Sequence, residues 1–498
     1  MADHFISRQQ AEGDLLNAAA FIGERIKSAD GHAEAMKAIV PMYLAKDDVD
    51  LAAELANQID EPFSRDKLLT QIAIKCAELD DDEYAIQLAD AIEDDGLRSQ
   101  AFESVAITKT NKNEFDKARE IAGMMMTPDY VFAGVAVGEA RLGNDAAADA
   151  AADGIDFVSA RVYAMHHLAA GAIEKGQNER AVAVLDKVAD AVIDIEHDEE
   201  RIRALCDTGN LFIEAKRNDK AIAVYDRARD EAEQLDNIHR DNLLGTCALG
   251  FLYAGSEDLC ERALDLVMDK TQMSSALVAM ARWEWQHDKK EDAKDSVDEA
   301  YEILKSQRDV ETRDSRTRNG LMTAIAVQLA AFDEADKAIE AAQANDDPDE
   351  TASGLSQIAQ VLTTQGKDDV ARQALVEIPE DASRLFALIG LADVKFRSDE
   401  TDAGIAFLNE TASLADAVPQ LALRANALSD IADRLFEHGE TERAHEVAAE
   451  ALNVISEIKD ESSQAVALAY LGGIYSGREI EMNDAARASV KRLVDRTD

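Results

Sequence analysis

Residues 161–195 read RVYAMHHLAAGAIEKGQNERAVAVLDKVADAVIDI. Met165, Leu168 and Ala172 recur at i, i+3 and i+7, which is the spacing of one apolar stripe on an α-helix. Gly176 follows the stripe and suits the left-handed conformation that commonly ends a helix. A second apolar stripe then starts. The stretch therefore predicts two consecutive helices joined by a tight turn.

The first helix of this pair recurs along the chain as an Arg followed at offsets 4 and 7 by apolar residues and at offset 8 by Ala or Gly. Eight copies start at Arg65, Arg98, Arg161, Arg201, Arg240, Arg318, Arg384 and Arg424. Five more copies lack the Arg and start at His32, Pro128, Met273, Thr351 and Gln464. Such a fixed period indicates a stacked repeat array, in which each pair buries its apolar stripe against its neighbours.

Two details of the repeat predict its packing. The residue at offset 8 is Ala or Gly in every copy except the one with Val40, so two helices should approach closely there. Some units run to about 40 residues instead of 33, and the extra residues stand near the end of the second helix, as in 189–195. Seven extra residues make about two helical turns, which lengthens the helix without changing its buried face.

These residues resemble the tetratricopeptide repeat family, in which an aromatic residue follows at offset 11 and an Ala at offset 20. The Ala at offset 20 is present in Ala85, Ala118, Ala148, Ala181, Ala221, Ala293, Ala371 and Ala444, and the aromatic residue in Tyr43, Phe212, Phe251 and Tyr475. The family's Trp at offset 4 is missing. The resemblance covers about residues 32–485 and implies an all-α superhelix, a solenoid of about thirteen helix-turn-helix repeats.

The array is expected to have caps at both ends. Residues 1–31 are predicted to form an N-terminal capping helix, centred on an amphipathic stretch at 11–27. Residues 32–483 form the repeat array, and residues 484–498 a C-terminal capping helix. The basic segment 305–318 breaks the period and is interpreted as a solvated loop or a helix extension.

The composition limits the classes of partner. The formal net charge is −48, a field that repels nucleic acid and anionic membranes. The acidity has two interpretations: a halophile-like surface that stays hydrated in salt, or a groove for a basic partner. Neither a signal peptide nor a membrane span is recognisable, and the four cysteines are widely spaced, so we expect a cytoplasmic protein.

Motifs of catalysis are missing from the sequence, so we expect neither an enzyme nor a bound cofactor. His166 and His167 are adjacent and point about 100° apart on a helix, so they cannot share a metal ion on one face. The repeated Arg lies on the core stripe of its helix. It is interpreted as an inter-repeat ion-pair residue, with ligand binding as the alternative.

The resemblance implies that first helices line a concave face and expose offsets 2, 5, 9 and 12. The resulting candidate partner-binding residues are Tyr130, Tyr163, His166, Arg203, Asn210, Asn242, Arg282 and Trp285. Aromatic side chains, Arg and Asn are residue types that peptide grooves use. The alternative is that Trp285 packs on the next unit and that the polar residues face water.

Two functions follow as hypotheses. The first is a non-catalytic protein–protein interaction scaffold that binds a peptide or a partner protein on the concave face. The second is a structural solenoid that associates with itself to form a homo-oligomer or filament.

Overall fold

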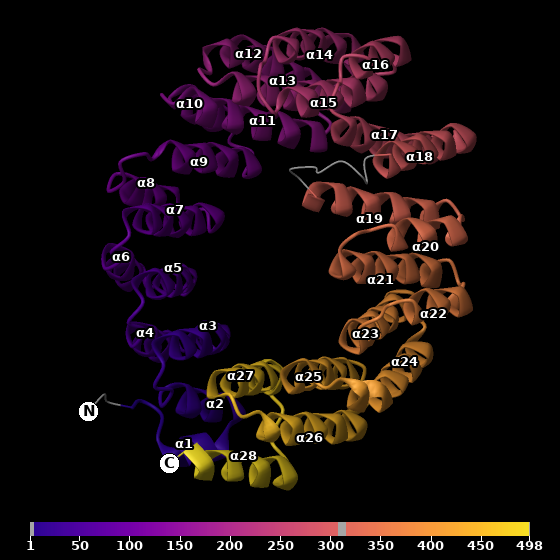
Figure 1. Cartoon of the computed structure of the whole chain (residues 1–498). Helices are drawn as coiled ribbons and strands as arrows, with labels where there is room; N and C mark the ends of the chain where they lie inside the picture. Colours follow the sequence, from indigo (N-terminus) through magenta and orange to yellow (C-terminus); the bar gives the residue numbers. More distant parts are fainter. Residues whose placement is uncertain (1–3, 307–314, 498) are drawn as a thin grey trace. The chain divides into compact units, whose positions relative to one another are not determined.

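The chain folds as an all-α solenoid. The computed structural model describes residues 4–306 and 315–497, and in these residues it has 28 α-helices, two short 3₁₀ segments and no strand (Figure 1). The predicted fold class is therefore confirmed. Of the basic segment 305–318, residues 307–314 lie outside the described residues. None of the described helices has the length and apolar character that a membrane crossing needs.

The helices alternate as first and second members of thirteen pairs. The first helices are α3 (Ala29–Ala45), α5 (Pro62–Glu78), α7 (Asp95–Asn111), α9 (Asp129–Arg141), α11 (Val158–Glu174), α13 (Asp198–Glu214), α15 (Arg240–Tyr253), α17 (Lys270–Gln286), α19 (Ser315–Ala331), α21 (Pro348–Thr364), α23 (Asp381–Arg397), α25 (Leu421–Glu437) and α27 (Glu461–Gly477). The second helices are α4 (Val49–Asn57), α6 (Asp82–Asp90), α8 (Phe115–Ala122), α10 (Asp145–Asp153), α12 (Asn178–Ala191), α14 (Asn218–Glu233), α16 (Glu257–Leu264), α18 (Lys290–Lys305), α20 (Ala335–Gln343), α22 (Asp368–Val376), α24 (Thr401–Leu414), α26 (Thr441–Glu457) and α28 (Asp484–Thr497). Two short helices, α1 (Arg8–Gly13) and α2 (Leu15–Gly23), precede the pairs.

The second helices fall into two length classes, as the repeat spacing predicts. In the shorter units they have 8 or 9 residues, for example in α6 and α22. In the units of about 40 residues, α12, α14, α18, α24 and α26 have 14 to 17 residues. The extra residues thus extend the second helix, by about two turns.

In each pair, the turn between the two helices contains one residue with a positive φ. Gly176, with φ 72°, is such a residue, and the N–H of Gln177 behind it donates to the carbonyl of Ala172 at 2.8 Å. This bond is typical of a helix that ends in the left-handed conformation. Glycine serves at Gly143, Gly176, Gly255, Gly366 and Gly439, and other residues serve at Asp47, Asp80, Asn113, Lys216, Asp288, Asp333, Asp399 and Glu479.

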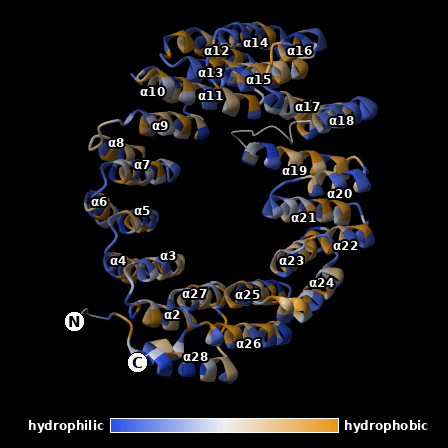
Figure 2. Cartoon of the chain, in the orientation of Figure 1, coloured by the Kyte–Doolittle hydropathy of each residue, from blue (hydrophilic) through white to orange (hydrophobic). Residues whose placement is uncertain are grey.

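The described chain divides into two compact units. Unit 1 comprises residues 1–109 and 363–498, and unit 2 comprises residues 110–362. Within each unit the first helices of successive pairs pack on one another and the second helices cover one side of that layer (Figure 1). Apolar residues gather between the helices while polar residues face outward (Figure 2). Cys76 and Cys247 lie in this core, as their positions in the repeat predict.

Unit 1 brings the first and last helices together in an end seam, formed by α2 against α27. A Cβ added at Gly472 would lie 2.8 Å from the backbone nitrogen of Leu16, so only glycine allows this approach. Gly472 is the offset-8 residue of the last repeat. The single helix predicted over 11–27 is instead two helices, because Asp14 is extended and its side chain caps α2 by accepting from the N–H of Asn17 at 2.9 Å. The helix α28, which covers Asp484–Thr497 of the predicted C-terminal capping segment 484–498, packs on α26, α1 and α2.

The repeated Arg ties a first helix to the loop before it. Arg201 donates to the carbonyl of Ile195, six residues earlier, at 2.8 Å. The same bond joins Arg98 to Ile92, Arg161 to Ile155, and Arg384 to Ile378. The predicted ion pairs between neighbouring repeats are present at Arg65–Glu93 (3.0 Å) and Arg318–Asp346 (2.9 Å). A guanidinium that satisfies both a carbonyl and a carboxylate fixes the angle at which two pairs meet.

Candidate peptide-binding face

The layer of first helices in unit 2 presents one row of equivalent side chains. Helices α9, α11, α13 and α15 pack in sequence, each on the next. At offset 2 of their repeats they carry Tyr130, Tyr163, Arg203 and Asn242, and all four side chains are exposed. We call this row the N-terminal ridge, because each residue lies near the start of its helix. Four of the eight predicted binding residues therefore share one surface.

Three exposed aromatic rings form an aromatic cluster at the start of the ridge. Tyr130 meets Phe157 at a centroid distance of 6.3 Å and Tyr163 at 6.0 Å, both edge to face. These rings remain 41%, 51% and 47% exposed, in the order Tyr130, Phe157 and Tyr163. His167, one turn after Tyr163, packs against the Tyr163 ring at 4.4 Å. Exposed rings that touch across three elements are an interaction surface rather than part of a core.

The backbone beneath the cluster is held by two hydrogen bonds. The N–H of Phe157 donates to the Asp129 carboxylate at 3.1 Å, and Arg161 donates to the carbonyl of Ile155 at 3.3 Å. Two other repeats use an Asp at the same offset, where Asp66 and Asp241 accept from backbone N–H groups of the following loop. The Phe157 loop is thereby fixed before any partner arrives, which lowers the entropy cost of binding.

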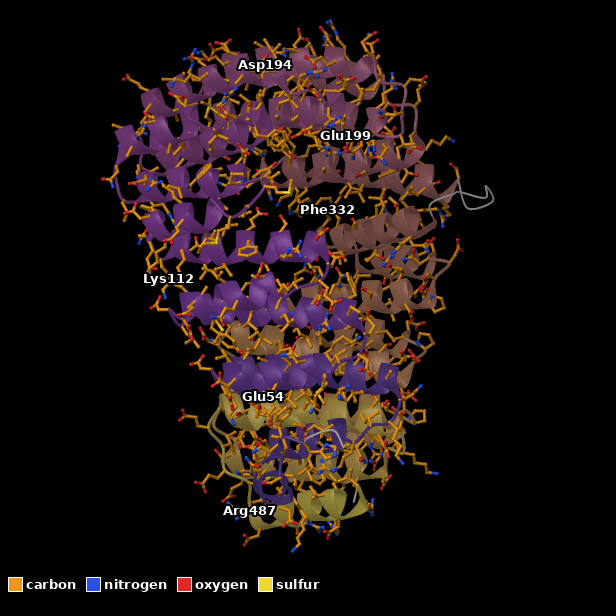
Figure 3. The ribbon with its side chains drawn as sticks, turned by 90° about the vertical axis from the view of Figure 1, so that its left-hand side faces the viewer. Glu54, Lys112, Asp194, Glu199, Phe332 and Arg487 are labelled. Atoms are coloured by element: carbon orange, nitrogen blue, oxygen red, sulfur yellow. The ribbon has the colours of Figure 1, made fainter. Side chains whose placement is uncertain are left out.

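An acid cleft follows the cluster on the next repeat. It has a volume of about 530 Å³ and is lined by His197, Asp198, Glu199, Glu200, Arg203, Leu235 and Asn237. Glu199, labelled in Figure 3, lies in the first turn of α13 and pairs with Arg203 at 2.9 Å. The His239 ring approaches the same carboxylate at 3.3 Å. With three carboxylates and one Arg, the cleft carries a negative charge.

His166 lies under the ridge rather than on it. Its Nε2 is 2.8 Å from the hydroxyl of Thr208, whose own hydrogen is donated to the carbonyl of Ala204 at 2.7 Å. The ring must therefore donate, which fixes the neutral Nε2–H tautomer. Burial, with a smaller contribution from the neighbouring His167, lowers the pKa of His166 to about 4. His166 supports the packing of α11 on α13 and has no free donor to offer a partner.

The other predicted residues are engaged by neighbouring helices. Asn210 accepts from the hydroxyl of Tyr225 at 2.6 Å, and Asn242 donates to Gln272 at 3.1 Å. Trp285 stacks on Phe332 of the next pair with a centroid distance of 4.1 Å. Arg282 reaches Gln328 of the same pair at 3.4 Å. The structure thus brings Tyr130, Tyr163 and Arg203 together and places Trp285 and Arg282 apart from them, in an inter-repeat contact.

A smaller cavity of about 200 Å³ opens toward the other end of α11. Its walls include His167 and the cations Arg141, Lys175 and Arg180. Arg180 is paired with Asp145 and, at 3.1 Å, with Asp149, while Lys175 donates to the carbonyl of Ala140. The cavity lining also includes the acids Asp145 and Glu174, so charges of both signs meet there, whereas carboxylates outnumber cations at the cleft.

Two components of the face were not predicted from the sequence. Phe157 directly precedes α11, and the carboxylates Asp198, Glu199 and Glu200 form the first turn of α13. All four lie before the Arg of their repeat, whereas the predicted face begins at offset 2. A comparison of the residues just before each Arg would have found them, since Phe157 and His197 occupy the same offset. Among the described residues, no group of three or more His, Cys, Asp or Glu side chains is arranged to hold a metal ion.

Comparison with known proteins places few constraints on the chain. No family model and no curated protein matches it. Matching solved structures include Ton1535 from Thermococcus onnurineus NA1, with 14% identity, covering 71% of this chain and 97% of that chain, at a TM-score of 0.25. They also include the STAND protein with a tetratricopeptide repeat sensor, PH0952, from Pyrococcus horikoshii (12% identity, 73% and 67% covered, TM-score 0.28). A third is the APC/C hetero-tetramer Cut9–Hcn1 (12% identity, 79% and 88% covered, TM-score 0.23).

Proposed function

We propose that the chain is a non-catalytic protein-interaction scaffold that binds a peptide segment of a partner protein along the N-terminal ridge of unit 2. The observation that carries the proposal is the aromatic cluster, whose three rings stay about half exposed while their backbone is fixed. Rigid exposed aromatics bury large apolar area at a low entropy cost, which is why binding surfaces use them.

The place of action that we propose is the cytoplasm. All four cysteines are free thiols and buried. Cys206 and Cys247 lie with their sulfurs only 3.8 Å apart and are not joined. Such a thiol pair fits a reducing compartment.

The alternative of end-to-end self-assembly lacks support in unit 1. The faces of α2 and α27 that would have to meet a second copy are buried against each other, with Leu15 and Leu16 at 2% and 0% exposure. Stacking through these faces would first require the end seam to open. We therefore favour binding of a different protein.

Site-specific photo-cross-linking in the native cells tests the proposal. A benzoyl-phenylalanine placed at Tyr163 should yield discrete adducts with one or a few proteins. The matched control places the same side chain at Phe63, which is 50% exposed and lies in unit 1. Identical adducts at both positions, or none at Tyr163, would refute binding at the ridge.

A further inference from the structure

Several aromatic rings of this chain have one of the chain's own cations over their face, among them the exposed ring of Phe63. Lys67 lies over Phe63 at 4.3 Å, and Arg372 over Phe407 at 4.4 Å. The same arrangement is found at Lys305–Tyr301, Lys289–Trp283 and Lys290–Trp285, at 5.0 to 5.3 Å. A cation over a ring face is attracted by the negative charge of the π-system. Within the described residues, neither Phe157 nor Tyr163 has such a cation.

The acid cleft lies on the repeat that follows the one carrying these two rings. Tyr163 and Arg203 occupy the same offset of consecutive repeats, as do Phe157 and His197, and α11 packs on α13. The axes of packed helices lie about 8–10 Å apart, and we take this spacing as the separation of the rings from the carboxylates. Arg203, the cation that lines the cleft, is paired with Glu199, and Arg201 pairs with Asp198, so the three carboxylates outnumber these two Arg side chains by one. Rings without a cation therefore adjoin carboxylates in excess.

We propose that the aromatic cluster and the acid cleft together form a docking site for a basic peptide segment, in which one Lys or Arg lies on the rings of Phe157 and Tyr163 and a second enters the cleft. The proposal deepens the proposed function and rests on it. Charge complementarity selects this occupant, because both features attract cations and the cleft repels acidic segments.

The separation of the two features sets the spacing of the two cations. An extended peptide advances about 3.1–3.4 Å per residue, so about 10 Å corresponds to three residues. The preferred segment therefore carries its basic residues at positions i and i+3. A peptide of the same composition with adjacent basic residues can engage only one of the two features at a time.

Fluorescence anisotropy with labelled synthetic peptides tests the proposal on the full chain. The probes are a peptide with Arg at i and i+3, a version with both Arg replaced by Gln, a version with both replaced by Glu, and one with the two Arg adjacent. We expect the first to bind about tenfold or more tighter than the Gln version, and the Glu version not to bind. Equal binding of the Arg and Gln peptides, or tighter binding of the Glu peptide, would overturn the proposal.

Two double variants test the contributions of the aromatic cluster and of the acid cleft separately. The double variant Phe157→Ala, Tyr163→Ala should weaken Arg-peptide binding about three- to thirtyfold at every salt concentration. The double variant Glu199→Gln, Glu200→Gln should weaken it mainly at low salt, because screening removes the contribution of exposed carboxylates. The control for the rings is Phe63→Ala, which removes a ring of about equal exposure that Lys67 already covers. The control for the carboxylates is the double variant Glu291→Gln, Asp292→Asn, which changes two acids in the first turn of α18.

The outcomes separate this inference from the proposed function. If the controls weaken binding as much as the site variants do, the effect is one of general charge and the docking site is wrong. If Tyr163 cross-links a partner in cells while the Arg and Gln peptides bind alike, the scaffold function stands and the basic occupant is refuted. Circular dichroism of each variant shows whether it is folded, and Tyr163→Phe, which keeps the ring, should bind like the wild type.

Discussion

The first helices of the two units differ in how their surface side chains are used. In unit 1, Arg434 of α25 donates to both carboxylate oxygens of Asp393 of α23 at 2.7 and 2.9 Å, and Tyr470 of α27 donates to Asp430. Polar groups there are used to join one repeat to the next. In unit 2, the rings of Phe157 and Tyr163 stay about half exposed, and Arg203 pairs with Glu199 of its own helix rather than with a neighbouring repeat. A helical repeat surface is available for binding where its side chains are not needed by its neighbours.

The offset-11 position of the repeat, which lies in the core, also holds different types of residue in different repeats. In unit 1, Lys109 and Lys395 occupy it, with side chains 0% and 4% exposed and their ammonium groups paired to acids of the turn. In unit 2, Phe212 and Phe251 occupy it and are buried at 1% and 0%. Two repeats of unit 1 thus bury a paired ammonium group at this position, which is costly to break, whereas others in the same unit bury Tyr43 or Tyr475 there.

The largest effect is expected at Lys109. Its ammonium donates to the carbonyl of Ala77 at 2.8 Å and pairs with Asp80 at 3.1 Å and with Asp82. Lys109→Met keeps the stem but leaves these acceptors without the charge, so the free energy of unfolding should fall by about 3 kcal/mol. Guanidinium unfolding followed by circular dichroism measures the change. Lys395→Met is the comparison and should cost about 1 kcal/mol, because its partners Asp368 and Glu400 are carboxylates in contact with water, whereas Lys109 also donates to a buried carbonyl. Equal losses of unfolding free energy in the two variants would contradict this expected difference between Lys109 and Lys395.

A smaller loss is expected at Arg434. Arg434→Gln removes the bidentate pair with Asp393, and we expect a loss of about 2 kcal/mol in the free energy of unfolding. A double-mutant cycle with Asp393→Asn should give a coupling energy of about 1 kcal/mol. Additive effects would show that the two side chains act independently and that the face of unit 1 is not held by this pair.

Mild acid should weaken unit 2 through His166. The pKa of His166 is lowered from 6.5 to about 4 by burial, so the unfolded state takes up a proton between these pH values and the folded state does not. The stability that the neutral ring contributes is therefore present above about pH 6.5 and lost as the pH falls toward 4. Because the ring is only partly buried, the effect should be about 1 kcal/mol. Urea unfolding of the wild type and of His166→Asn should show their difference shrinking over this range; a constant difference would exclude the titration.

The smallest effect on stability is expected on the ridge itself. Arg203 makes an exposed pair with Glu199 within α13, with a side chain that is 50% exposed. Arg203→Gln should change the free energy of unfolding by less than about 0.5 kcal/mol. Thermal unfolding beside Arg434→Gln measures the contrast. A loss at Arg203 as large as that at Arg434 would remove the distinction between the two faces.

The regular part of the fold follows from local spacing in the sequence. The position of Gly176 predicts its turn, the offset-8 residues predict close helix contacts, and the longer units predict the longer second helices. Non-glycine turns such as Asp47 and Asp80 have no such signal, since their left-handed conformation is imposed by the packing of two helices. The candidate site was predictable where it depends on helix registers, at Tyr130, Tyr163 and Arg203.

The remaining parts depend on contacts that the repeat period does not contain. Trp285 stacks on Phe332, 47 residues later, across the most irregular step of the array. The contact of Leu16 with Gly472 joins the helix before the first repeat to the last repeat, so the sequence around either residue does not point to the other. Phe157 lies in a loop, where helix offsets give no direction for a side chain.

The end seam also affects how the chain folds during synthesis, because its two helices are made at different times. Helix α27 is translated about 440 residues after α2, which at ribosomal rates of about 5–20 residues per second is a delay of about 20 to 90 seconds. During that time the apolar side chains of α2, including Leu16, lack their native cover from α27. Unit 2 is one continuous stretch and can finish folding on the ribosome, whereas unit 1 has to wait for the last repeats before its first helices are sheltered from aggregation.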